Sequence, residues 1–218
     1  MNKSWVAFFG AFGLSFIFSG HANADCKAEV DGAFEKLRAG KAFNLTTKIT
    51  NDKQGALSMS VDYVLPDRMH QRVTLGDSPT SMETIVVGTK VWSNQGQGWA
   101  EVPANFAEAI AKQMQDTVAA PSKSKVDYEC LGDQDFEGKT YAAYRAALPA
   151  VTDEPIAGSP AVKEKPGKPN QQTLYVDKQT GLPARNIVTA ADASDKRLFD
   201  GVFTTPQGLD IKEPSTAK

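Results

Sequence analysis

Histidine and cysteine are scarce in this sequence, which contains two of each among its 218 residues. Apart from His21 near the N-terminus, the chain has one histidine, His70, in a strand-like alternation between Arg68 and Arg72. A Ser-His-Asp or Cys-His arrangement needs a base beside its nucleophile, and we expect His70 to be solvated instead. The sequence also lacks GxGxxG, P-loop, HExxH and GxSxG patterns. We therefore predict no enzyme and no catalytic residue, although carboxylates that the fold brings together would leave no pattern.

The sequence supports neither metal binding nor nucleic-acid binding. Two cysteines far apart in the sequence and one histidine do not supply the ligands of a zinc site. The formal net charge of −2 gives no electrostatic reason to bind nucleic acid. We expect no metal, no cofactor and no nucleic-acid partner.

The N-terminal segment has the pattern of a cleaved secretory signal. After one positive charge, residues 5–18 form an uncharged, largely apolar run that is shorter than the roughly 20 residues of a membrane-spanning helix. Ala22 and Ala24 occupy the two positions that a signal peptidase reads. Asp25, directly before the next cysteine, argues against a lipid anchor. We predict that residues 1–24 are removed and that the mature chain is periplasmic, with no transmembrane anchor.

Both cysteines of the chain, Cys26 and Cys130, follow the predicted cleavage site and would enter a compartment that permits disulfides. Their even number favours a bridge, and two free thiols are the alternative. A bridge that closes a loop of roughly 100 residues contributes about 4–5 kcal/mol in the chain-entropy model. Cys26 also lies on the apolar stripe of a predicted helix, so a bridge would attach this helix to the strand that carries Cys130.

Two helices are predicted. Gly40 ends the first, and its stripe consists of Cys26, Val30, Ala33, Phe34 and Leu37. The second begins at Asn105 as N-cap with Glu108 three residues on, and Pro121 stops it. The apolar stripe of the second helix consists of Phe106, Ile110, Met114 and either Thr117 or Val118.

Period-two alternation of apolar and polar residues predicts about ten antiparallel strands. In the first, Phe43, Leu45, Thr47 and Ile49 share one face. The predicted strands cover residues 43–50, 57–65, 69–75, 82–87, 90–93, 99–102, 126–136, 140–148, 172–177, 184–190 and 197–204, with a last short segment at 209–211.

Residues 149–170 interrupt this pattern with prolines and lysines and almost no large apolar side chain. The segment is predicted to be a loop, either a surface insertion or a lid over a ligand site. We otherwise expect one domain over residues 25–214, followed by a polar tail at 215–218.

Geometry relates these elements to each other. Ten strands spaced about 4.8 Å apart make a sheet about 48 Å wide, which two helices about 10 Å across cannot cover. The sheet must therefore curl, and a curled sheet either encloses an apolar cavity or is filled by its own side chains. We predict an α+β fold in which a strongly curved, unclosed antiparallel sheet wraps over two or three helices.

Three stretches resemble LolA-like and LppX-like periplasmic proteins. Residues 64–70 with 82–92 resemble their "P-D-R-M … E-x-I-V-I-G … W" stretch, residues 173–185 their late hairpin, and residues 199–214 their final strands. The resemblance implies a half-barrel sheet over helices, with a hydrophobic cavity for lipid or lipoprotein acyl chains. It identifies no cargo and no ligand contacts residue by residue.

Two functions follow as hypotheses. The first is a carrier that holds a lipid or a lipoprotein acyl chain against the concave face of the sheet. The second is a protein-interaction or envelope-stress module without bound lipid. For the carrier, the expected lining residues are Leu57, Met59, Val61, Tyr63, Met69, Val73 and Leu75 from the strands, and Phe106, Ile110 and Met114 from the second helix.

Overall fold

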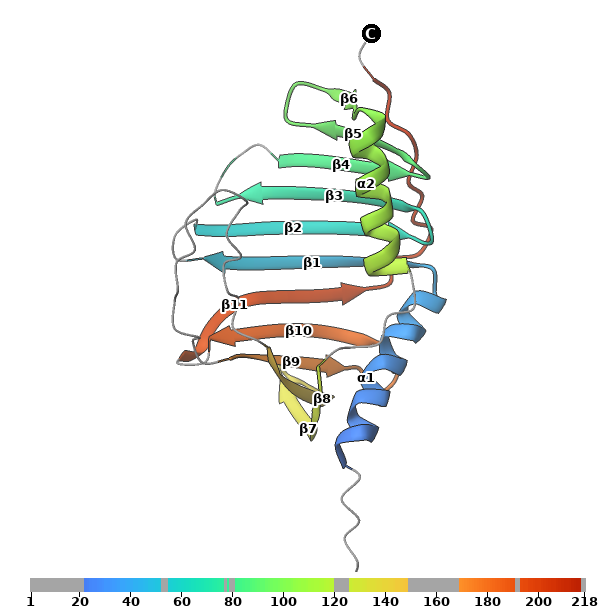
Figure 1. The fold of residues 1–218 in the computed structure, drawn as a ribbon. Coiled ribbons are helices and arrows are strands. Elements are labelled where there is room, and N and C mark those ends of the chain that lie inside the picture. The colour runs from blue at the N-terminus through green and yellow to red at the C-terminus, as the bar shows by residue number, and fades with distance from the viewer. Residues whose placement is uncertain are drawn as a thin grey trace, which may run out of the picture.

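The computed structural model describes residues 22–51, 55–76, 78, 81–119, 126–148, 169–190 and 193–216 (Figure 1). Eleven antiparallel strands form a single sheet in the order β6-β5-β4-β3-β2-β1-β11-β10-β9-β8-β7. The strands are β1 (Ala42–Asn51), β2 (Gly55–Val64), β3 (Arg68–Leu75), β4 (Ser81–Val87), β5 (Lys90–Asn94), β6 (Trp99–Glu101), β7 (Glu129–Phe136), β8 (Lys139–Leu148), β9 (Asn170–Val176), β10 (Pro183–Ala190) and β11 (Ala193–Thr204). Because β6 and β7 are its two edges, the sheet is unclosed, and the predicted α+β class is confirmed.

Two predicted segments fall largely outside the described residues: the signal peptide over 1–24 and residues 149–168 of the proline-rich loop. The division into a single domain over 25–214 and a tail stays a prediction. Neither described helix is long and apolar enough to cross a membrane.

Both helices lie on the same side of the sheet and over one end of its strands (Figure 1). Helix α1 (Ala22–Ala39) turns the predicted stripe toward the sheet, with Cys26, Val30, Ala33 and Leu37 buried. Phe34 is half-buried and contacts Phe203 of β11 edge to face, with ring centroids 5.7 Å apart. The predicted helix and its stripe are therefore confirmed.

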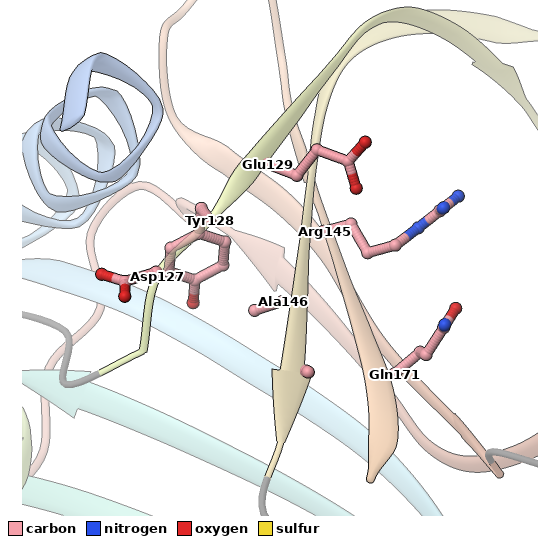
Figure 2. Close-up of a pocket in the computed structure, with 7 residues that line it drawn as sticks. Asp127, Tyr128, Glu129, Arg145, Ala146 and Gln171 are labelled. Atoms are coloured by element: carbon pink, nitrogen blue, oxygen red, sulfur yellow. The ribbon is translucent and has the colours of Figure 1, made fainter. Parts of the chain in front are cut away.

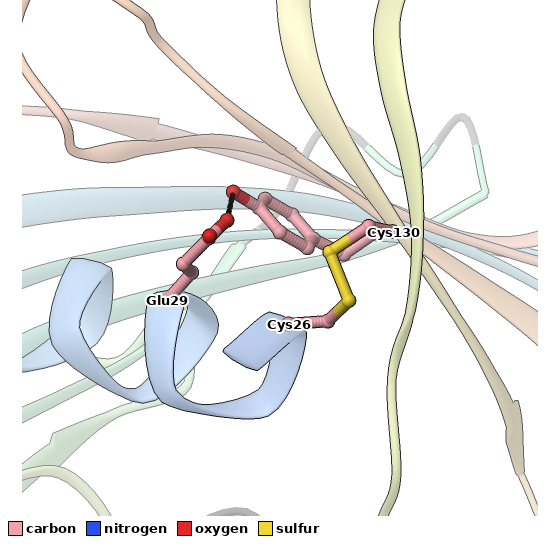
Figure 3. The surroundings of a disulfide bond; sticks show 4 residues. Cys26, Glu29 and Cys130 are labelled. Atoms are coloured by element: carbon pink, nitrogen blue, oxygen red, sulfur yellow. Dashed lines mark hydrogen bonds between the residues drawn. A yellow bond between two sulfur atoms is a disulfide. The ribbon is translucent and has the colours of Figure 1, made fainter. Parts of the chain in front are cut away.

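The predicted disulfide is also confirmed. Cys26 in α1 is bonded to Cys130 in β7 across a sequence separation of 104 residues. Beside it, the Tyr144 hydroxyl of β8 donates a hydrogen bond to the Glu29 carboxylate of α1 at 2.6 Å (Figure 3). The disulfide and this hydrogen bond attach α1 to β7 and β8, at one edge of the sheet.

Helix α2 (Ala104–Met114) crosses the strands near β5 and continues into the π-helical turn η1 (Gln115–Ala119). Its N-cap is Pro103, whose carbonyl accepts hydrogen bonds from the backbone N–H groups of Phe106 and Ala107, both at 3.0 Å. The predicted N-cap at Asn105 is therefore wrong, because the first turn closes on a carbonyl two residues earlier.

The last described residues, 205–216, form neither helix nor strand and run along the sheet from β11 back toward β5 (Figure 1). Ile211 is buried against Ile85 and Trp92, and its carbonyl accepts a 2.8 Å hydrogen bond from Arg68. This segment covers the face of β4 and β5 opposite the helices, because Ile85 and Trp92 are cross-strand partners one residue from the helix-side pair Val86 and Val91.

Candidate ligand-binding face

The helix side of the sheet is built from rows of residues that the strand register aligns across β1 to β5. The row beneath the helices is buried throughout and packs with Leu37 of α1 and with Ala107, Ala111 and Met114 of α2. This covered row consists of Phe43, Tyr63, Met69, Val86 and Val91. Burial raises the pKa of the Tyr63 phenol, as expected where water is excluded. At this end, the described side chains fill the helix side of the sheet, which we call its concave face.

Farther along the same strands the concave face opens. Leu57 is the cross-strand partner of both Ile49 and Leu75, and Val73 is the partner of both Met59 and Met82. We call these six residues the open patch: Ile49, Leu57, Met59, Val73, Leu75 and Met82. Leu75 is 53% exposed and Met82 is 42% exposed, while the other four are half-buried. An apolar patch left in water on one face of a sheet is a candidate binding surface.

The predicted lining residues divide between these two zones. All seven strand residues lie on the helix side, as the alternation predicts. Val61, Tyr63 and Met69 are buried in the packed core, whereas the other four strand residues belong to the open patch: Leu57, Met59, Val73 and Leu75. The alternation therefore predicted the correct face, and the position of the helices decides which part of it a ligand can reach.

The second helix contributes less to this face than expected. Met114 is buried in the core and Ile110 packs against it, but Phe106 points outward and is 61% exposed. The positions that face the sheet are Ala107, Ala111 and Met114, so the predicted stripe through Phe106 is wrong. Two small alanines let the helix lie close to the strands, and a pattern weighted by large apolar residues overlooks them.

The predicted lining also left out four residues in or beside the open patch: Ile49, Met82, Phe199 and Gly201. Met82 continues the open patch onto β4, and its even spacing from Val86 on the same strand could have signalled that it shares the helix side. Phe199 of β11 lies opposite Ile49, and Gly201 lies opposite Thr47. No local pattern pairs residues of β11 with those of β1, because the two strands are far apart in the sequence.

Charged side chains collect on the opposite face of the sheet. Arg185 of β10 binds Asp200 of β11 through two hydrogen bonds, at 2.5 Å and 2.8 Å, and also contacts Glu137 at 3.1 Å. The guanidinium of Arg185 holds the pKa of the Asp200 carboxyl below its usual value. On the helix side, by contrast, the six residues of the open patch are all uncharged.

His70 belongs to that polar face as well. Its Nε2 lies 2.8 Å from Glu83 and its Nδ1 lies 2.9 Å from Arg72, and only 18% of its side chain is exposed. The expectation that His70 is solvated is therefore wrong. Both ring nitrogens of His70 lie within hydrogen-bond distance of side chains on its own strand and on β4. We therefore interpret His70 as a structural residue of the sheet.

A small pocket of about 290 Å³ lies near the other edge of the sheet, beside β7, β8 and β9 (Figure 2). Its lining includes the charged residues Asp127, Glu129 and Arg145, together with Gln171. Glu129 and Arg145 are cross-strand partners. Although Tyr128, Ala146 and Ala147 add apolar surface to this pocket, its three charged side chains suit a small polar solute better than an acyl chain, which requires apolar walls.

Neither a protein-family model nor the sequence of a characterised protein matches this chain. By structure, the chain is similar to LprF from Mycobacterium bovis, with a TM-score of 0.56 and 12% identity over 90% of this chain and 100% of that chain. It is also similar to the lipoprotein LppX from Mycobacterium tuberculosis, with a TM-score of 0.54 and 10% identity over 87% of this chain and 99% of that chain. The chain therefore has a fold like that of LprF and LppX, as the LppX-like motifs in its sequence indicate.

Proposed function

We propose that this protein is a non-catalytic periplasmic carrier that binds an acyl chain of a lipid or lipoprotein against the open patch. The observation that carries the proposal is the contrast within one face of the sheet. The covered row is sealed beneath two helices, while Leu75 and Met82 lie on the same side of the sheet and expose apolar surface to solvent. The row of Val61, Gln71 and Thr84 separates them from the covered row. The predicted signal peptide and its cleavage after Ala24 support the periplasmic location.

The chemistry of the patch suits a flexible hydrocarbon chain. Its six residues are aliphatic or methionine, they lie on three of the central strands and on β4, and they carry no charge that an apolar ligand would have to desolvate. Each ligand methylene that is removed from water contributes about 0.8 kcal/mol. Methionine adapts to chains of different shape because its side chain is unbranched and its sulfur is polarisable.

Lipid extraction with native mass spectrometry tests whether the purified protein carries a ligand. Displacement of a fluorescent fatty-acyl probe then tests the location of the site. Leu75→Gln and Met82→Gln should weaken probe binding with little effect on unfolding, because both side chains are already exposed. Phe106→Gln is the matched control, since it removes a hydrophobic residue that is at least as exposed from the outward side of α2 and should leave binding unchanged.

The results separate the carrier from its alternative. If the wild-type protein carries no lipid and binds no acyl probe, the carrier proposal fails and the protein-interaction module takes its place. Equal loss of binding in all three variants would mean that the probe adheres to exposed apolar residues in general, which would also count against a site at the open patch.

A further inference from the structure

A single hydroxyl group is buried without a partner on the concave face, among the residues that the structure describes. Thr47 of β1 is 0% exposed, and its Oγ1 accepts and donates no hydrogen bond. Its position between Leu45 and Ile49 places it on the helix side of the strand. Because a hydroxyl loses its hydrogen bonds to water on burial, an unpartnered one destabilises the folded protein. A ligand that supplied an acceptor here would recover that loss.

The surroundings of Thr47 explain both its burial and how it could be reached. Its partner on β11 is Gly201, which has no side chain, and the Phe199 ring lies over that glycine. A Cβ atom at Gly201 would lie 2.8 Å from Cε1 of Phe199 and 3.4 Å from a methyl group of Leu45. The ring thus occupies the space beside Thr47 that an ordinary residue at 201 would fill. Phe199 is itself only half-buried, so part of its surface is already in contact with solvent.

Thr47 lies at the border of the open patch. Its cross-strand partner on β2 is Met59, and Phe199 is the partner of Ile49, so both neighbours belong to or adjoin that patch. An acyl chain lying on the patch would therefore pass directly beside the Phe199 ring. Rotation of this one ring would bring the hydroxyl into contact with the chain.

The uncharged surroundings of Thr47 restrict the kinds of ligand that can bind there. The residues that the register places around Thr47 are all uncharged: Leu45, Ile49, Met59, Asn186, Phe199 and Gly201. An ionised carboxylate or a phosphate would lose its hydration without gaining a cation from any of them. A neutral carbonyl oxygen needs one donor, and the Thr47 hydroxyl is such a donor.

We propose that Thr47 is a specificity-determining residue whose hydroxyl donates a hydrogen bond to the carbonyl oxygen of a neutral acyl ester bound at the open patch, with the Phe199 ring turned aside. This inference rests on the proposed carrier function and specifies its ligand as an acyl ester. A plain hydrocarbon leaves the hydroxyl unpartnered, so the site selects esters over alkanes. An ionised fatty acid gains the same hydrogen bond but loses the hydration of its charge.

We would test this selection by displacing a fluorescent acyl probe from the full mature chain with methyl palmitate, hexadecane or ionised palmitate. In the wild-type protein, methyl palmitate should bind more tightly than the other two compounds. Thr47→Val, which replaces the hydroxyl by a methyl group, should weaken methyl palmitate by about three- to tenfold, the usual effect of one neutral hydrogen bond. Hexadecane should bind Thr47→Val and the wild-type protein equally well. Thr47→Ser restores the hydroxyl and should retain the preference for the ester.

Thermal unfolding of Thr47→Val is measured in parallel and should show no loss of stability, because the substitution removes an unpartnered polar group. If Thr47→Val binds ester and alkane as the wild-type protein does, the role of Thr47 is refuted and the carrier function stands. Tighter wild-type binding of ionised palmitate than of its methyl ester would refute the neutral ester. A wild-type protein that binds none of the three compounds refutes the carrier function, and with it the role of Thr47.

Discussion

The hydroxyl of Tyr144 donates a 2.6 Å hydrogen bond to the carboxylate of Glu29 beside the Cys26–Cys130 disulfide, so two interactions of different kinds join α1 to the far edge of the sheet (Figure 3). Tyr144 is buried against the same cluster as Cys26 and Val30. Burial, followed by the hydrogen bond to Glu29, raises the pKa of the Tyr144 hydroxyl. The phenol therefore stays neutral, and remains a donor, well above ordinary pH.

Removal of each attachment should have a distinct effect. Tyr144→Phe should lower the free energy of unfolding by about 1 kcal/mol, the usual net value of one hydrogen bond. The paired change Cys26→Ser with Cys130→Ser should cost more, about 2–5 kcal/mol, because the unfolded chain is no longer constrained across 104 residues, and the chain-entropy value of about 4–5 kcal/mol is the upper end. Urea unfolding of both variants measures this order, and a larger loss for Tyr144→Phe would contradict it.

Acid should weaken the fold through Asp200. Hydrogen bonds from Arg185 lower the pKa of this carboxyl in the folded protein. A depressed folded pKa stabilises the protein above the unfolded value of about 4, and this contribution is lost as the pH falls through the lower folded pKa. Asp200→Asn should therefore be less stable than the wild-type protein at pH 7 and should lose less stability between pH 7 and pH 3. Urea unfolding at the two pH values measures the difference, and parallel losses would show that Asp200 does not contribute.

Substitution of two methionines on neighbouring strands tests whether the covered row is packed more tightly than the open patch. Met69 belongs to the covered row, whereas Met82 belongs to the open patch and is 42% exposed. Met69→Ala should cost about 2–5 kcal/mol of unfolding free energy, as expected for a large-to-small change in a filled core. Met82→Ala should cost less than about 1 kcal/mol, because little apolar surface is removed from the core. Similar losses for both variants would mean that the open patch is as tightly packed as the covered row.

The sequence predicted those parts of the fold that depend on local periodicity. The correct disulfide was predicted from the even number of cysteines in an exported chain. Alternation identified the helix-side face of β1 and β2, and helical spacing placed Cys26 on the buried stripe of α1. Both patterns are repeated over a whole element, so a single atypical residue does not hide them.

Properties that depend on tertiary packing could not be predicted in the same way. The orientation of α2 is set by Ala107 and Ala111, which fit closely against the sheet, and the larger Phe106 is left outside. The division into covered row and open patch depends on where the helices cross the strands. The position of Phe199 and Gly201 beside Ile49 and Thr47 depends on the pairing of β11 with β1, which no local sequence pattern records.

The close approach of Phe199 to Gly201 gives a last prediction that is independent of any ligand. A Cβ atom at position 201 would lie 2.8 Å from the ring, so Gly201→Ala should force the ring aside and cost about 1–3 kcal/mol of unfolding free energy. Phe199→Leu should relieve this clash, so the double variant should lose less stability than the two single losses together. The helical Gly32, where an added Cβ atom would have no neighbour within 4 Å, is the control: Gly32→Ala should raise stability by about 0.5–1 kcal/mol. Urea unfolding of the four variants gives the coupling energy, and additive losses would show that the ring does not lie over Gly201 in solution.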